Sequence, residues 1–231
     1  MTAATSILSR IKDLVGDDVT DITGHKDLIN SGFNFVADLI PNNSEIWRHS
    51  ELNSENSGIS DDSSEYKIVL VTRSDSSDST NRICVEVPLD YLRRGEDASS
   101  IYYNAGNYKN PIFSIDENGG VIVRPTGGTA VIYYYTYITN QDITGATNFS
   151  DLDGTGALKF PEQAGYLAIL KASSNLLHAQ ISNAVHDDED QELVGLLNAN
   201  AASIDKAMQE ESQRLSLPHQ LVGDGQEEGF K

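Results

Sequence analysis

The first forty residues contain two stretches in which apolar side chains recur at helical spacing. Residues 5–15 place one stripe on a single face, formed by Ile7, Leu8, Ile11, Leu14 and Val15. Residues 24–40 repeat the pattern with Ile29, Phe33, Val36 and Ile40. Gly16 supplies a stop for the first segment, and Pro41 follows the second. We therefore predict two amphipathic helices.

Between residues 66 and 138 the apolar positions change to the spacing of strands. The β-rich runs are 66–72, 82–87, 111–125 and 130–138. The Ser- and Asp-rich segment 73–81 separates the first two runs as a hairpin tip, and Asn118-Gly119-Gly120 divides the third at a tight turn. These runs predict a small antiparallel sheet or sandwich.

Helical spacing returns after residue 160, where Pro161 and Glu162 suit a first helical turn. One stripe comprises Leu167, Leu170, Leu177, Ile181 and Val185. A second comprises Leu193, Leu197, Ala201, Ile204, Met208 and Leu215, and it ends before Pro218. The short acidic break at 187–190 between the stripes predicts an antiparallel helical hairpin.

Polar segments complete the predicted domain organisation. Residues 49–65 are expected to be a flexible linker, 141–159 a loop and 218–231 a flexible C-terminal tail, because they contain little to bury. The expected fold class is α+β. A four-helix bundle is formed by residues 1–48 and 160–217, and residues 66–140 are an inserted antiparallel β-sheet or sandwich domain.

The chain is strongly acidic, with 35 Asp and Glu against 16 Lys and Arg and a formal net charge of −19. Binding a nucleic-acid backbone by counterion release needs clustered cations, so this class of function is disfavoured. A passage through which DNA slides without adhering remains compatible with the charge. Acidic balance can equally serve only to prevent aggregation.

Few residues suggest catalysis or the binding of a cofactor. We therefore predict that the protein is not an enzyme and that it has no cofactor. Cys84 is the single cysteine, and its apolar neighbours favour a small core residue over a nucleophile. The histidines are scattered at His25, His49, His178, His186 and His219, without metal-ligand spacing. His178 adjoins the apolar stripe and is expected in the core or at an interface.

Residues 151–162 follow the order of an EF-hand calcium loop. Asp151, Asp153 and Thr155 occupy the first, third and fifth positions, and Glu162 the twelfth. Lys159 stands where an oxygen ligand is expected, and the preceding segment does not have a helical pattern. Calcium binding is therefore an alternative hypothesis, and an ordinary helix start explains Glu162 equally well.

Tyrosines are concentrated in the last predicted strand. Tyr133, Tyr135 and Tyr137 share one face of a regular strand and are candidates for an interface, because each ring buries area at little entropic cost. The alternative is that alternate tyrosines fill the sheet core.

Two stretches resemble the head–tail connector, or neck adaptor, proteins of tailed bacteriophages. The first runs from 92–100 (LRRGEDASS) through 101–103, 108–115 (YKNPIFSI) and 119–125 (GGVIVRP) to the Tyr-rich strand 131–137. The second is Phe160-Pro161-Glu162-Gln163-Ala164 followed by the helical hairpin. The order of helix pair, β insert and helix pair is similar to the adaptor layout over most of the chain.

The resemblance implies a structural virion protein at the neck, assembled in the host cytoplasm. Its partners would be identical copies in a ring, usually of twelve, with the portal protein above, a tail or neck protein below, and DNA passing through the lumen. The family's C-terminal segments often reach into the portal, a role that would fall here to Leu215, Leu217, Leu221 and Phe230. Alternatives are another virion subunit, such as a tail terminator or capsid accessory protein, or a calcium-dependent binding module.

Overall fold

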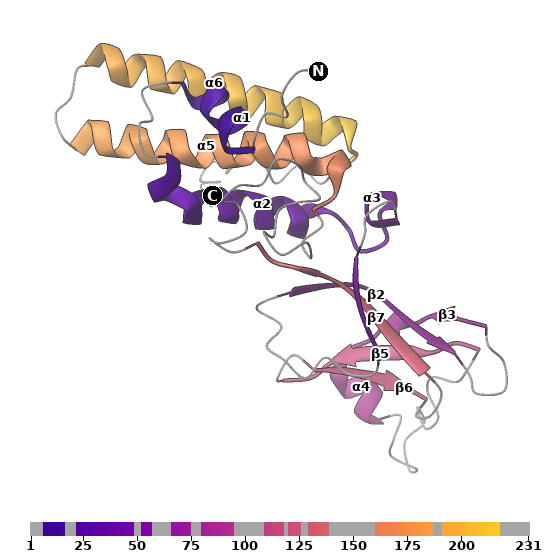
Figure 1. Ribbon diagram of the computed structural model, residues 1–231. Helices are drawn as coiled ribbons and strands as arrows, with labels where there is room; N and C mark the ends of the chain where they lie inside the picture. Colours follow the sequence, from indigo (N-terminus) through magenta and orange to yellow (C-terminus); the bar gives the residue numbers. More distant parts are fainter. Residues whose placement is uncertain are drawn as a thin grey trace, which may run out of the picture. The chain divides into compact units, whose positions relative to one another are not determined.

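The computed structural model describes residues 7–16, 22–48, 52–56, 66–74, 80–94, 109–117, 120–125, 129–138, 160–186 and 191–217. The chain divides into two compact units. The helical unit combines residues 1–50 with 138–231, and the β unit is the intervening segment 51–137. With helices in one unit and small antiparallel and mixed sheets in the other, the chain is an α+β protein, as predicted (Figure 1).

The helical unit is organised around one long central helix, α5. Its elements are α1 (Ile7–Val15), η1 (Ile22–His25), α2 (Lys26–Leu39), α3 (Glu45–Arg48), α5 (Glu162–His186) and α6 (Gln191–Arg214). α5 contacts α1, α2 and α6, and in Figure 1 α6, α5 and α2 follow one another from top to bottom. The four predicted helices therefore share one unit, but a closed four-helix bundle is not confirmed, because their contacts are concentrated on α5.

The close approach of α2 to α5 depends on a small residue. A Cβ atom at Gly32 would lie 2.8 Å from both the Cα and the backbone N of Ala172 on α5. Beside this crossing, Phe33 is fully buried and its ring meets Phe160 edge to face at 5.2 Å. Asn175 on α5 donates to the Leu28 carbonyl at 3.1 Å. The N-terminal and C-terminal helices thus share a core, because α2 presents a flat, apolar face to α5.

Polar side chains fix the ends of this arrangement. Asn34 on α2 holds the backbone of Ile138 from both sides, since its Oδ1 accepts from the Ile138 N–H at 2.8 Å and its Nδ2 donates to the Ile138 carbonyl at 3.1 Å. Asn200 on α6 donates to the carbonyl of Leu14 in the last turn of α1 at 3.1 Å. Helix ends leave carbonyls without partners, and this amide satisfies one of them.

The β unit contains two sheets that pack around one core. Its elements are β1 (Asn53–Asn56), β2 (Tyr66–Ser74), β3 (Arg82–Ile83), β4 (Val85–Glu86), α4 (Leu89–Arg94), β5 (Ile112–Ile115), β6 (Val121–Arg124) and β7 (Thr129–Thr136). The sheet orders are β1-β7-β2-β3 and β4-β5-β6. The shared core is formed by Tyr66, Ile68, Val71, Cys84, Phe113 and Ile132. This is the sandwich alternative of the sequence prediction.

A single bent strand joins the two sheets. β3 pairs with β2 in one sheet, and two residues later β4 pairs with β5 in the other. Cys84 lies at the bend, buried, with its N–H donating to the Val71 carbonyl at 2.8 Å. The prediction of an entirely antiparallel insert is wrong here, because the bend brings β4 alongside β5 in parallel.

The prediction of a flexible linker at residues 49–65 is wrong for four of these residues. Asn53–Asn56 form β1, which pairs antiparallel with β7 at the edge of the larger sheet. The segment has no apolar pattern because an edge strand can be held by the hydrogen bonds of its backbone alone.

A bulge in β2 lies opposite two tyrosines of β7. The β2–β7 register shifts between Ile68 and Leu70, opposite Tyr134 and Tyr133. The extra residue is in β2, and β7 keeps its own alternation. Ile132 belongs to the sandwich core and Tyr134 packs against it, while Tyr135 is buried as well.

Candidate docking surfaces

Two of the leucines predicted to dock on the portal, Leu215 and Leu217, lie at the C-terminal end of α6, where the chain forms a helix cap. Leu217 is buried, and its N–H donates to the Ser212 carbonyl at 3.0 Å. Ser216 has a positive φ of 55°, which reverses the chain in the manner of a Schellman cap. Leu215 is half-buried. A buried capping leucine is not presented to a partner, and the other two predicted residues, Leu221 and Phe230, lie outside the described residues.

The predicted tyrosine interface is only partly exposed. Tyr133 and Tyr137 are half-buried, whereas Tyr135 is 2% exposed and its ring lies 6.1 Å from that of Tyr137. Tyr134 packs edge to face on Tyr66 at 5.5 Å. The three predicted residues therefore do not form one open face, because Tyr135 between the other two is buried.

The calcium-binding hypothesis depends mainly on residues outside the described part of the chain. Asp151, Asp153 and Thr155 lie outside the described residues. Glu162 is the exposed first residue of α5, where its carboxylate suits the positive end of the helix dipole. Within the described ranges, no group of three or more His, Cys, Asp or Glu side chains could hold a metal ion.

The polar cluster that most resembles catalytic chemistry joins α5 to α6. Ser174, which is buried, donates its hydroxyl to Asp205 Oδ1 at 2.9 Å. His178 Nε2 lies 3.7 Å from Asp205 Oδ2. In a nucleophilic triad the serine must face the histidine, whereas here both side chains face the carboxylate. The cluster is explained by helix pairing. His178 is exposed, so of the two predicted alternatives, core or interface, the core position is wrong and the interface stays a prediction.

Lys171, one turn before Ser174 on α5, belongs to the same surface. Its Nζ lies 5.0 Å from the centre of the Phe35 ring on α2. Desolvation lowers the pKa of Lys171, and the charge of Asp205 partly opposes this shift. The lysine thus links α2 to α5 through a cation–π contact.

Cys84 behaves as a core residue, as its sequence context predicts. The side chain is 4% exposed, and burial raises the pKa of its thiol to about 11, with the Arg73 charge acting in the opposite direction. A thiol with so high a pKa is almost entirely protonated at neutral pH and is a poor nucleophile.

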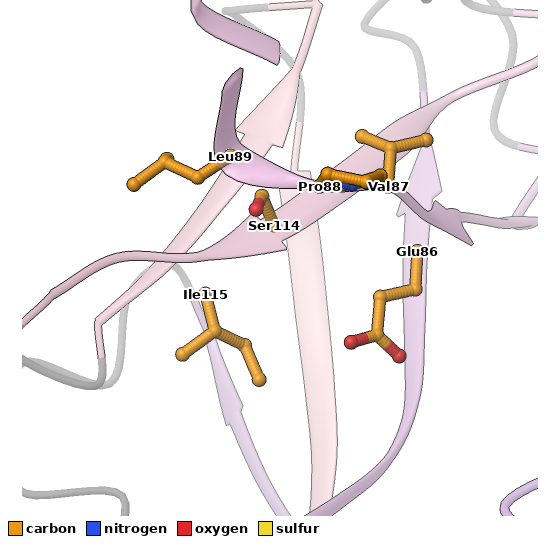
Figure 2. A pocket seen from close by; sticks show the side chains of 6 residues that line it. All are labelled: Glu86, Val87, Pro88, Leu89, Ser114 and Ile115. Atoms are coloured by element: carbon orange, nitrogen blue, oxygen red, sulfur yellow. The ribbon is translucent and has the colours of Figure 1, made fainter. Parts of the chain in front are cut away.

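The β unit has an open pocket of about 480 Å³ where β4 leads into α4. It is lined by Glu86, Val87, Pro88, Leu89, Ser114 and Ile115. In Figure 2 the Glu86 carboxylate and the Ile115 side chain extend toward the same side, while Leu89 points away from Glu86. One carboxylate and one hydroxyl without a basic partner give neither a general base pair nor an activated nucleophile.

Sequence patterns did not single out the exposed apolar side chains that the structure shows. Ile83 and Val85 flank Cys84 on the β unit and are 66% and 60% exposed. On the helical unit, the exposed residues are Tyr166 near the start of α5, Val185 near its end and Leu196 on α6. The spacing of the α5 residues predicts Val185 on the buried stripe, and this prediction is wrong for Val185. Contiguous exposed apolar side chains mark contact sites more often than isolated ones do.

Comparison with known proteins adds no family. Of the helices in the described part of the chain, none has the length and apolar character needed to cross a membrane. No protein-family model matches the chain, and no curated protein is similar enough to count as a match.

Proposed function

We propose that this chain is a non-catalytic structural subunit of a virus particle, a neck adaptor of a tailed bacteriophage. In this role, copies form a ring between the portal and the tail, and DNA passes through the lumen. The protein acts through the shape and placement of its surfaces. The proposal begins from the resemblance of residues 92–137 and 160–217 to such adaptors.

The observation that carries the proposal is the shared core of two distant helical segments. α1 and α2 pack on α5, more than a hundred residues later in the chain, while residues 51–137 form a compact unit of their own. An adaptor needs such a layout, because one unit can be held in a ring while an inserted unit offers separate contacts. Separate cores for the N-terminal and C-terminal helices would have removed this support.

The charge of the chain supports the conduit part of the proposal. With a formal net charge of −19, a ring of copies surrounds its axis with negative potential. DNA is repelled by such a wall and does not adhere to it, so it can move through during packaging and ejection. We expect no DNA binding by the purified protein in a salt titration.

The decisive experiment is electron microscopy with the portal protein encoded in the same genome. The expected result is a ring of this chain on one end of the portal, and labelled protein at the head–tail junction of particles. A label at the tail tip or over the capsid surface would instead identify another virion subunit. Absence of both portal binding and particle incorporation would refute the proposal.

A deletion tests the role of the C-terminal tail. Removing residues 219–231 leaves Leu217 in place, so the cap of α6 is preserved. If the tail docks on the portal, the deletion weakens portal binding while far-UV circular dichroism stays unchanged. The matched control keeps the tail but replaces Leu221 and Phe230 by Ala, which separates their apolar contacts from the tail's acidic charge. Unchanged portal binding by the deletion would exclude tail docking.

A further inference from the structure

The helical unit carries an apolar groove between α1 and the start of α5, which we call the α1–α5 groove. It has a volume of about 310 Å³. Three apolar and three charged residues line it, namely Leu14, Tyr166, Ile169, Arg10, Asp13 and Glu162. Ile169 is buried, whereas Tyr166 is 51% exposed. Sites for small molecules begin at about 300 Å³, so the groove suits a few side chains of a partner better than a cofactor.

The charges at the rim of the groove favour a cation. Asp13 and Glu162 carry carboxylates, and Arg10 is the one cation among the lining residues, so negative charge is in excess. Both carboxylates are exposed, and neither takes part in the ion pairs that join residues of the described ranges. The formal net charge of −19 on the whole chain adds to the negative potential around the groove.

A long basic side chain matches an apolar floor that has an acidic rim. Lysine and arginine pack their methylene stems along apolar surface and keep the charged group at its edge. Arginine fits better, because its planar guanidinium can lie on the exposed ring of Tyr166 while it donates to a carboxylate. Nucleic acids, anionic membranes and acidic protein surfaces are repelled by the same rim.

The helical unit uses the same chemistry within its own fold. The Nζ of Lys171 on α5 lies 5.0 Å from the centre of the Phe35 ring on α2. Burial lowers the pKa of this lysine, and the nearby charge of Asp205 opposes the shift. An aromatic ring and a carboxylate thus hold a basic side chain at the α2–α5 contact. The α1–α5 groove offers a ring and two carboxylates to a basic side chain from outside.

We propose that the α1–α5 groove binds an arginine-bearing segment of a partner protein. The stem of the arginine packs on Tyr166 and Ile169, and its guanidinium is held by the carboxylates of Asp13 and Glu162. An apolar residue beside the arginine covers Leu14. The inference deepens the adaptor role by stating the chemistry of one neighbour, and it rests on that role only for the identity of this neighbour.

A peptide titration with the full chain tests the proposal. The probe is a peptide with an uncharged fluorescent label, one central arginine between two leucines and no other charge. The control peptide carries citrulline, the uncharged analogue of arginine, at the same place. Fluorescence anisotropy is followed up to millimolar protein. We expect the arginine peptide to bind at least about tenfold more tightly than the citrulline peptide, and we expect added salt to weaken its binding.

Substitutions at the rim separate this site from general attraction to an acidic protein. The double variant Asp13→Asn, Glu162→Gln removes both rim carboxylates. The matched control, Asp27→Asn with Glu210→Gln, removes two exposed carboxylates elsewhere in the helical unit. We expect the rim variant to lose affinity for the arginine peptide about tenfold or more, and the control to lose much less. Arg10→Gln removes the competing cation and should tighten binding, a gain that damage to the fold would not produce.

Several results would overturn the proposal. These are equal affinities for the arginine and citrulline peptides, equal losses in the rim and control variants, and no binding by the wild type. A groove already filled by residues 219–231 would accept the peptide only after their deletion. A groove covered by a second copy would accept it only at low protein concentration. Either of these outcomes would replace the proposed partner and overturn it as well.

The peptide titration uses the chain by itself, whereas the adaptor role is tested with the portal. A ring on the portal without peptide binding would leave the adaptor role standing and remove the proposed site. Peptide binding without any association with the portal or the particle would keep the site and remove the adaptor role.

Discussion

Replacing Gly32 by Ala tests the closest contact in the helical unit. The new Cβ would lie 2.8 Å from two backbone atoms of Ala172, a separation that real Cβ atoms almost never show. Because a backbone cannot rotate aside as a long side chain can, α2 and α5 must move apart. The buried ring of Phe33, next to the crossing, would lose contacts as they do.

The size of the effect follows from two opposing contributions. Alanine stabilises a helix by up to about 1 kcal/mol relative to glycine. Overpacking a close-packed core costs about 1–3 kcal/mol, and backbone neighbours favour the upper part of that range. The expected net result is a loss of about 1–2 kcal/mol. At Gly195 on α6 no atom lies within 4 Å of the added Cβ, so Gly195→Ala should gain about 1 kcal/mol.

Urea denaturation followed by tryptophan fluorescence measures the free energy of unfolding of both variants. The signal comes from the helical unit, which contains both substitutions. Trp47 is the only tryptophan, is 2% exposed, and belongs to the helical unit, so it reports the unfolding of that unit. The propensity gain is common to both variants, and the difference between their free energies of unfolding isolates the clash. If Gly32→Ala and Gly195→Ala were equally stabilised, the described close crossing of α2 and α5 would be wrong.

Two further predictions concern the buried thiol of Cys84 and the half-buried amide of Asn34. Burial raises the pKa of the Cys84 thiol from 9.0 to about 11, so the thiol stabilises the fold fully below pH 9 and loses this contribution as the pH rises from 9 to 11. The loss corresponds to about 2–3 kcal/mol, and Cys84→Ala should remove that part of the pH dependence in urea titrations. Asn34→Ala leaves the N–H and the carbonyl of Ile138 without their partner and should cost about 1–3 kcal/mol. Asn34→Asp keeps an acceptor for the N–H and should lose less, and a wild-type denaturation midpoint for Asn34→Ala would show that the clamp contributes nothing.

Helices with one covered face were the most predictable part of the fold. Along α2 and its C-cap residue, all four positions of the predicted stripe, Ile29, Phe33, Val36 and Ile40, are buried. The buried positions of α5 were harder to predict, because its first half is covered by three helices and its last turns by fewer neighbours. Small residues such as Ala168 and Ala172 are therefore buried there, whereas Val185 at the other end is exposed. Periodicity identifies a helix face but not how far along the helix a neighbour extends.

Strand pairing depended on features that leave no periodic signal. The polar strand Asn53–Asn56 is held by its backbone, so no apolar alternation marks it. The bulge between Ile68 and Leu70 shifts the β2–β7 register, and the bend at Cys84 produces a parallel pair. The exposure of two apolar residues on α5 and α6 was missed for a related reason. Leu196 and Tyr166 are apolar residues on helices, and only the packed structure shows that neither is covered.

The split of the helical unit has a consequence for synthesis of the chain. α1 and α2 leave the ribosome early, but their packing partner α5 is complete only after roughly 150 further residues, about 7–30 s later at ordinary translation rates. Residues 51–137 are finished in the interval and can fold without waiting. The apolar faces of the first two helices stay uncovered during that time, so the nascent polypeptide exposes them to aggregation until α5 is complete.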